Sequence, residues 1–330
     1  MCFLSALVSL TRQRHIAPFY HAISNAVLPH VRNLYTVRTE KEFCEDLDTF
    51  LKYFEPISVS DWVKCAEDQV FPKKNTFLLS FDDGHRECFD VVAPILEKKG
   101  IPAIFFVNSG FVDNRALFYR YKVSLCIETL RETTEKDSVL KALAQILGIE
   151  KKDKESIRVA LLELKHDQEN IIAMVANKLS VSFDDFLQQV KPYLTSPQIQ
   201  NLLVRDFEIG AHSVSHPHYY EIPIAAQIQQ TEESLVFLEN NFGVQSRYFS
   251  FPFTDFGVKN DFFRYFYPSH SENRKISLSF GCAGLKNDTE RFHFQRIPME
   301  GRNQKASEIL TKAYLYYCAK AFLGKNTIYR

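Results

Sequence analysis

The chain alternates short apolar runs with longer stretches in which apolar residues recur every three or four positions. Residues 76–81, 101–107 and 207–211 form apolar runs, and further short strands are expected at 248–251, 276–280 and 292–297. Nearly continuous apolar runs are typical of parallel strands that are covered on both faces. Helical spacing follows over 43–54, 86–99 and 223–242, and Thr39 with Glu42 forms a capping box before the first of these helices. This alternation predicts an α/β fold with a parallel sheet, either open or closed into a barrel.

Residues 116–193 differ from the rest of the chain in amino-acid composition. They are rich in Lys, Glu, Leu and Ala, and they contain a single glycine, Gly148. Several helices are expected there, with the charged residues on a solvated face. We therefore expect one domain over residues 1–330, with a helical insertion at 116–193 that shapes access to the site rather than its chemistry.

Charge and cysteine content exclude several classes of protein. The 40 basic residues equal the 40 acidic residues, so there is no bulk electrostatic case for binding nucleic acid or an anionic membrane. The seven cysteines are odd in number and include no C-x-x-C pair, which indicates reduced thiols rather than a disulfide framework or a zinc cluster. The N-terminal apolar run lacks a preceding basic region, and no stretch approaches the ~20 apolar residues of a membrane span. A cytoplasmic location is expected.

Two pairs of polar residues follow predicted apolar strands. Asp82 and Asp83 end the run at 76–81, and His212 and His216 follow the run at 207–211. In parallel α/β folds, strand ends of this kind meet on one edge, where ligands bind. Two histidines and one carboxylate form a common ligand set for a catalytic metal, and the second carboxylate then remains free as a base. Alone, either motif would be read as a simple turn or as surface residues; together they favour a metal site.

These motifs resemble those of the polysaccharide deacetylases of the NodB-homology type, carbohydrate esterase family 4. The matching segments are "SFDDG" at 80–84 and "HSVSH" at 212–216, and the resemblance covers roughly residues 18–110 and 192–257. It implies a distorted (β/α) barrel with fewer than eight regular units. It also implies that Asp83, His212 and His216 bind the metal, zinc by ligand type, and that Asp82 is the general base. Ser213 would support the loop by hydrogen bonding, or would be a simple turn residue.

The sequence departs from the family pattern in two places. Ser250 stands where the family usually has an arginine that orients the base, and the usual late His-Asp motif is absent. His21, in "PFYHAIS", resembles an early histidine in the rearranged branch that includes the poly-N-acetylglucosamine deacetylases, where it acts as the acid. The competing interpretation is that His21 is a packed residue at the end of a strand.

The resemblance implies a metal-dependent hydrolase that removes N-acetyl groups from an amino sugar or polysaccharide. One alternative is a hydrolase of a small C–N amide or formamide, or of a lipid- or nucleotide-linked sugar. Another is a non-catalytic carbohydrate-binding protein on the same fold. Trp62, Tyr219 and Tyr220 are candidates for stacking on sugar, although packing in the core or at the rim is the favoured interpretation. The oligomeric state is left open.

Overall fold

The computed structural model describes residues 3–133, 137–268, 273–301 and 304–330, so Cys2 lies outside the described part. The chain forms two compact units. We call them the barrel unit (Met1–Asn25, Arg38–Asp113 and Tyr193–Arg330) and the helical unit (Ala26–Val37 and Asn114–Pro192). The six described cysteines are free thiols, in agreement with the sequence (Cys44, Cys65, Cys88, Cys126, Cys282 and Cys318).

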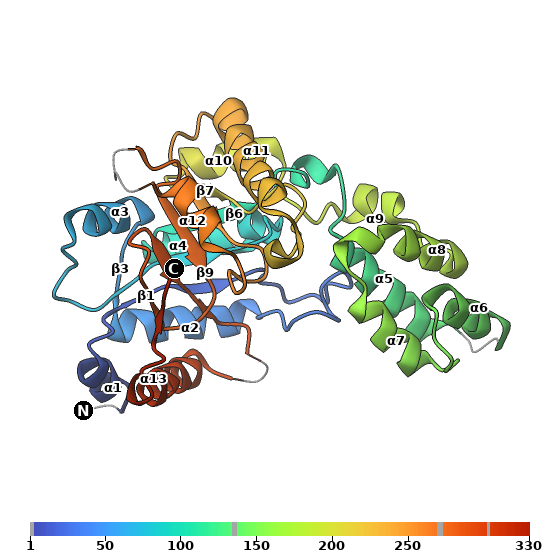
Figure 1. Cartoon of the computed structure of the whole chain (residues 1–330), viewed down its shortest axis with the longest axis horizontal. Helices are drawn as coiled ribbons and strands as arrows, with labels where there is room; N and C mark the ends of the chain where they lie inside the picture. The colour runs from blue at the N-terminus through green and yellow to red at the C-terminus, as the bar shows by residue number, and fades with distance from the viewer. Residues whose placement is uncertain (1–2, 134–136, 269–272, 302–303) are drawn as a thin grey trace. The chain divides into compact units, whose positions relative to one another are not determined.

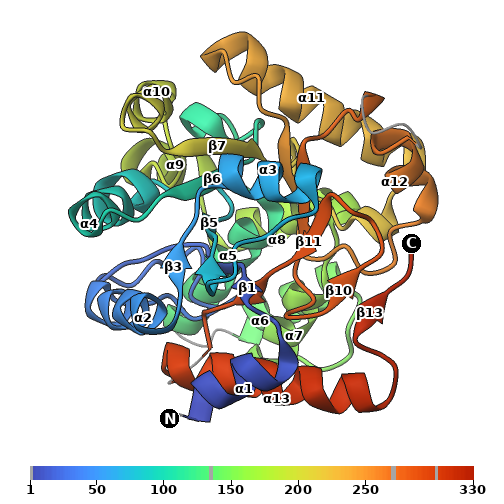
Figure 2. The ribbon, with the colours of Figure 1, turned by 90° about the vertical axis from the view of Figure 1, so that its left-hand side faces the viewer.

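An eight-stranded, wholly parallel sheet forms the centre of the barrel unit (Figures 1 and 2). Its strands, in spatial order, are β11 (His293–Gln295), β9 (Leu278–Gly281), β8 (Tyr248–Ser250), β7 (Glu208–Ala211), β6 (Ala103–Val107), β5 (Leu79–Phe81), β2 (Pro18–Tyr20) and β12 (Ile297–Pro298). The first and last strands of this order are consecutive in sequence, because only Arg296 separates β11 from β12. The sheet is therefore a nearly closed, distorted barrel, which confirms the fold predicted from the motifs.

One extended segment closes this barrel. The backbone N–H of Arg296 donates to the carbonyl of Gly281 beside β9 (3.1 Å), and the N–H of Ile297 donates to the carbonyl of Ala17 beside β2 (2.9 Å). The single strand predicted at 292–297 is thus two strands that pair with different neighbours. The backbone changes partner at Arg296, which we call the seam.

Helices cover the barrel strands. They are α1 (Phe3–Thr11), α2 (Glu40–Tyr53), α3 (Val59–Asp68), α4 (Ala93–Lys99), α10 (Ser196–Val204), α11 (Ile224–Phe242), α12 (Asn260–Phe266) and α13 (Ala306–Phe322). The predicted capping box begins α2, where the Glu42 N–H donates to Thr39 Oγ1 (3.2 Å) and the Thr39 N–H to Glu42 Oε2 (2.8 Å). The helix predicted at 86–99 begins with a π-helical turn, Cys88–Val92, and ends as expected at Gly100, which has a φ of +64°. Terminal helices α1 and α13 lie side by side (Figure 2).

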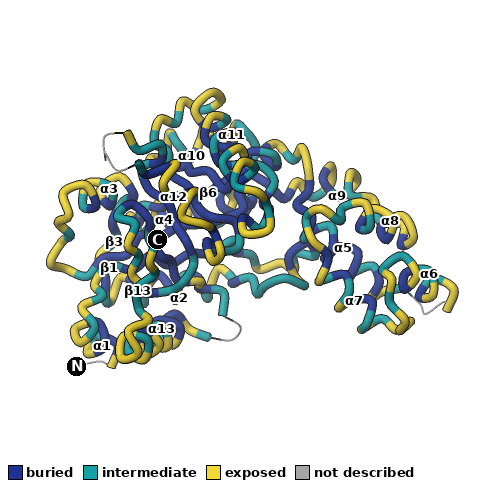
Figure 3. The backbone as a smooth tube through the Cα atoms, viewed as in Figure 1, coloured by how far each residue is buried: buried dark blue, intermediate teal, exposed yellow. Residues whose placement is uncertain are grey.

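Short strands extend the barrel unit at two places. One group consists of β1 (His15–Ile16), β4 (Thr76–Phe77) and β3 (Glu55–Pro56), and the other of β10 (Asn287–Asp288) and β13 (Thr327–Ile328). Buried residues follow the central strands, whereas the outer faces of the helices are exposed (Figure 3). The abundant phenylalanines fill this core, and among them Phe77, Phe81, Phe105 and Phe106 are fully buried.

The helical unit contains α5 (Tyr119–Glu132), α6 (Asp137–Leu147), α7 (Lys154–Glu163), α8 (Glu169–Leu179) and α9 (Phe183–Val190). Helices α5 and α6 each pack against both α7 and α8, around buried residues such as Leu143 and Ile172. The role of this block as an insertion that shapes access stays a prediction. Among the described helices of the whole chain, none combines the length and the apolar character that crossing a membrane requires.

Candidate active site

The polar residues predicted at strand ends lie together at the carboxyl end of the barrel. Asp82 and Asp83 follow β5, and the N–H of Asp82 continues the ladder by donating to the carbonyl of Tyr20 in β2 (2.9 Å). His212 follows β7, and its N–H donates to the carbonyl of Val107 (2.9 Å). Parallel strands place their carboxyl ends on one edge, so residues more than 100 positions apart in sequence become neighbours.

Asp83, His212 and His216 bring three ligand atoms together. Nε2 of His212 lies 3.1 Å from Nε2 of His216, and Asp83 Oδ1 lies 3.5 Å and 3.2 Å from these two nitrogens. Ligand atoms at about 2.0–2.2 Å from a tetrahedral zinc are separated by roughly 3.3–3.6 Å, so this triangle fits a metal of that size. The three residues predicted from the motifs therefore form a candidate metal centre with a fourth position for water or substrate.

The local backbone conformation orients these three ligand side chains. Asp83, Ser213 and His216 all have positive φ values of 68°, 68° and 57°, an uncommon conformation for residues other than glycine. Ser213 Oγ accepts a hydrogen bond from the N–H of His216 (3.0 Å), so Ser213 supports the loop as predicted. His212 Nδ1 lies 2.8 Å from the carbonyl oxygen of Ser250 and must donate to it, which leaves Nε2 free to bind a metal.

The site favours an ionised Asp83. Burial alone would raise the pKa of this carboxyl, but the neighbouring imidazoles of His216 and His212 hold the pKa well below its usual range. Asp83 is only 4% exposed. A buried carboxylate that stays ionised needs a cation beside it, and the donor set of two imidazoles and one carboxylate suits a divalent metal.

Asp82 is held by an arginine that the motifs did not reveal. The guanidinium of Arg296 donates to Asp82 Oδ1 (2.8 Å) and Oδ2 (2.6 Å) in a two-pronged pair. Its other N–H groups donate to the Oγ of Ser80 (3.0 Å) and of Ser250 (2.6 Å) and to the carbonyl of Gly281 (3.3 Å). All five donors of this buried side chain are therefore used.

Arg296 resolves the first departure from the family pattern. Ser250 lacks the expected guanidinium, but it accepts a hydrogen bond from the guanidinium that enters from the seam. Burial alone would raise the pKa of Asp82, whereas Arg296 first, and then His212, lower it below the usual value. The only sequence signal for this role is that Arg296 falls in the short strand predicted at 292–297, where His293 and Gln295 are polar as well.

His21 lies beside Asp82 and is paired with a second residue that the motifs did not reveal. Because Tyr20 of β2 is in register with Phe81 of β5, the next residues, His21 and Asp82, extend side by side from the two strands. His21 Nδ1 lies 2.6 Å from Glu300 Oε2, and the His21 N–H donates to Glu300 Oε1 (2.6 Å). Burial would lower the pKa of His21, but Glu300 and then the two aspartates raise it to about 9. His21 as proton donor stays a prediction.

A chain of rings in contact leads from His216 to the exposed Tyr220, and we call it the aromatic ridge. The ring of His216 lies 4.6 Å from that of Phe253, which stacks at 3.6 Å on His218, and His218 lies 5.3 Å from Tyr220. Tyr220 is 48% exposed. Of the three aromatic residues considered for sugar stacking, only Tyr220 is on this rim.

Tyr219, Trp62 and a further histidine, His293, lie elsewhere. Tyr219 is fully buried against Phe249 and Phe251, and Trp62 is buried in α3. His293 bonds to Ser279 Oγ (2.7 Å) and Asp255 Oδ2 (3.1 Å), in a cluster distinct from the metal centre. These three residues are therefore not part of the candidate active site.

Comparison with known proteins agrees with this geometry. The family model described as polysaccharide deacetylase matches residues 70–157 and 162–263, more than half of the chain. No sequence among the curated proteins matches significantly.

Solved structures share the fold at low sequence identity. The deacetylase PplD of Streptococcus pyogenes, in complex with acetate, has a TM-score of 0.56 at 13% identity, over 89% of this chain and 96% of that one. IcaB from Ammonifex degensii has a TM-score of 0.53 at 16% identity, over 91% and 97%. The BpsB deacetylase domain from Bordetella bronchiseptica has a TM-score of 0.50 at 14% identity, over 86% and 95%. With the family match and the barrel that carries its two motifs, this chain belongs to the polysaccharide deacetylase family.

Proposed function

We propose that this chain hydrolyses the N-acetyl groups of amino-sugar residues in a polysaccharide, with a divalent metal, zinc by ligand type, bound by Asp83, His212 and His216. The observation that carries the proposal is the convergence of three metal-ligand atoms beside a buried, arginine-held carboxylate. Three protein ligands leave the open position that a catalytic metal needs. When bound, such a metal polarises the acetamide carbonyl and lowers the pKa of water.

Asp82 would act as the general base. Its carboxylate is ionised because Arg296 lowers its pKa, and it lies 4.0 Å from His212 Nε2, next to the metal-ligand atoms. The two-pronged pair fixes the plane of the carboxylate, so its position relative to the attacking water is set in advance. Asp82 accepts the proton of that water as the amide carbonyl is attacked.

His21 would act as the general acid. An amine is a poor leaving group unless it is protonated as the C–N bond breaks, so the site needs a donor of that proton. With a pKa of about 9, His21 is protonated at neutral pH. Glu300 holds Nδ1, which leaves the proton on Nε2 for transfer to the departing amino sugar.

Two alternatives remain as outcomes of the test. A hydrolase of a small amide, or of a lipid- or nucleotide-linked sugar, would use the same centre, although the exposed end of the aromatic ridge at Tyr220 favours a substrate that continues beyond the cleaved group. A non-catalytic sugar-binding protein would have no need for a base. The use of all five Arg296 donors around Asp82 argues against this second alternative.

Acetate release from oligomers of N-acetylglucosamine tests the proposal. The protein would be stripped with a chelator, reloaded with zinc and compared with the stripped form. Asp82→Asn is the matched control, because it should keep the metal but lose turnover. If metal-loaded protein binds the oligomer but releases no acetate, the non-catalytic alternative is correct. If it cleaves only a small acetamide or formamide, the polysaccharide assignment is wrong.

A further inference from the structure

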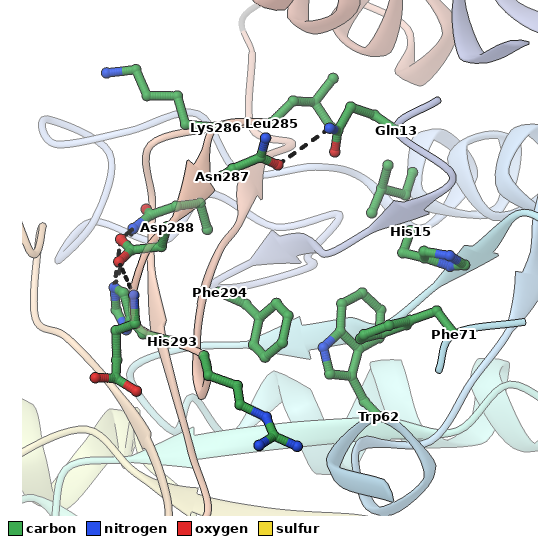
Figure 4. A pocket seen from close by; sticks show the side chains of 15 residues that line it. Gln13, His15, Trp62, Phe71, Leu285, Lys286, Asn287, Asp288, His293 and Phe294 are labelled. Carbon is green, nitrogen blue, oxygen red and sulfur yellow. Dashed lines mark hydrogen bonds and ion pairs between the residues drawn. The ribbon is translucent and has the colours of Figure 1, made fainter. Parts of the chain in front are cut away.

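The barrel unit contains a second candidate site at the end opposite to Asp82. A cavity of about 360 Å³ is lined by residues that precede the barrel strands, including His15 and Ile16 of β1, and by segments around β10 and β11 (Figure 4). β1 leads into β2, whose other end carries His21. The cavity and the candidate active site are therefore separated by the length of the barrel strands.

Aromatic rings form one wall of this cavity. The ring centroids of Trp62 lie 5.5 Å from Phe71 and 5.4 Å from Phe294, and His15 lies 4.8 Å from Phe71. Phe71, Phe294 and His15 are only partly buried, so parts of their rings remain open to the cavity. Such a wall suits a ligand that presents C–H groups.

Trp62 supplies an unused hydrogen-bond donor. Its side chain is 2% exposed, and its Nε1 has no hydrogen-bond partner among the described residues. Figure 4 shows this nitrogen on the ring edge that is turned toward Phe294, among the residues that line the cavity. A buried donor without an acceptor is unfavourable, and an oxygen of a bound ligand would satisfy it.

Two of the charged groups around the cavity already have partners. Arg291 donates to the backbone carbonyls of Ala66 (2.7 Å) and Glu67, and Asp288 is paired with Arg330 (3.1 Å). Burial and the nearby Arg14 lower the pKa of His15 to about 4, so its ring is neutral at pH 7. In Figure 4 the Lys286 side chain points away from the rings. The rings of the aromatic wall and the Trp62 N–H therefore offer a ligand uncharged groups.

Two amides complete the lining. Gln13 Nε2 donates to Asn287 Oδ1 (3.2 Å) and to the hydroxyl of Tyr317 (2.8 Å), and these amides stand opposite the aromatic wall (Figure 4). Side-chain amides donate and accept at once, which matches hydroxyl groups. The cavity volume is near the lower end of the range for small-molecule sites, so it accommodates a single small ring.

We propose that this cavity binds one uncharged pyranose unit of a glycan, separately from the candidate active site. The sugar's C–H face packs on Phe71 and Phe294, an oxygen accepts the Trp62 N–H, and hydroxyl groups pair with Gln13 and Asn287. Among the described lining residues, Arg291 is already paired and Lys286 points away from the rings, which disfavours an anion. An aromatic hydrocarbon would leave the indole donor unsatisfied. This site does not depend on deacetylase activity.

Tryptophan fluorescence tests the proposal directly, because Trp62 is the only tryptophan of the chain. Titration of the full chain with N-acetylglucosamine or glucose should change the emission in a saturable way, whereas inorganic phosphate should not. Gln13→Ala and Asn287→Ala should weaken binding about 2- to 10-fold, as expected for one lost hydrogen bond each. Trp62→Phe, followed by calorimetry, should weaken it to a similar extent while circular dichroism stays unchanged.

Tyr220→Ala is the matched control at the other end of the barrel, and it should leave the fluorescence response intact. Loss of the response in this variant would mean that the sugar binds at the active-site rim, and would overturn the proposal. No saturable change with either sugar, or a saturable change with phosphate, would overturn it as well. Asp82→Asn should respond like the unmodified chain, so that failure of this site is distinguished from failure of the proposed catalytic function.

Discussion

Replacing Arg296 with methionine should separate the orientation of the base from the binding of the metal. The substitution removes two charge-assisted hydrogen bonds to Asp82, of 2.8 and 2.6 Å, and leaves only the Ser250 hydroxyl at 3.3 Å. Bonds to charged groups contribute about 1.5–3 kcal/mol each, and breaking one side of a buried ion pair costs about 3–5 kcal/mol. We therefore expect a loss of stability near 3–5 kcal/mol and, in the folded fraction, a fall in kcat of about 100-fold or more.

The assay is acetate release from an N-acetylglucosamine oligomer, measured across pH with zinc content determined on the same samples. Metal content should stay unchanged, because Arg296 contacts none of the three predicted ligands through a described hydrogen bond. The acidic limb of the pH–rate profile should move to higher pH. Arg296 lowers the pKa of Asp82, so its removal raises that pKa, and the base then becomes protonated at a higher pH.

Arg296→Lys is the control for charge without the planar fork. This variant should keep part of the lowering of the Asp82 pKa but lose the two-pronged hydrogen bonding. Its kcat should therefore lie between those of the unmodified chain and Arg296→Met. If folded Arg296→Met protein keeps its full kcat and an unshifted acidic limb, Arg296 does not position the base.

Three further results are expected. Glu300→Gln should move the basic limb of the pH–rate profile to lower pH, because the pKa of His21, about 9, depends on this carboxylate. An unmoved limb would show that another group donates the proton. Asp83→Ala should abolish zinc binding in elemental analysis whereas Asp82→Asn should retain it, and equal losses would contradict the division of roles between the aspartates. Tyr220→Ala should raise KM for an oligomer several-fold without changing turnover of a small acetamide, and equal effects on both substrates would remove the aromatic ridge from substrate binding.

The sequence was sufficient to predict the site residues that lie at the ends of strands. Asp83 and His212 each end an apolar run, and parallel strands must bring such ends together. His216 follows through the short loop after His212. The family motifs then predicted different roles for Asp82 and Asp83, which the local pattern alone could not do.

The supporting residues could not be predicted, because their positions depend on closure of the barrel. Arg296 reaches Asp82 over 214 residues of sequence, and Glu300 reaches His21 over 279. Neither contact can be recognised from the spacing of residues along the sequence, because each depends on the pairing of β12 with β2 across the seam. The same reason explains why a single strand was predicted where the structure has β11 and β12.

Because the seam closes the barrel, we expect activity to appear only at the end of folding. Asp82 and Arg296 come from strands far apart in sequence, so their pair forms only when the last barrel segment docks against β2. Contacts of such large sequence separation form slowly. During synthesis or refolding, the earlier strands and helices can assemble while the base still lacks its partner. Recovery of turnover should therefore lag behind recovery of helical structure, and enzyme activity becomes a reporter of barrel closure.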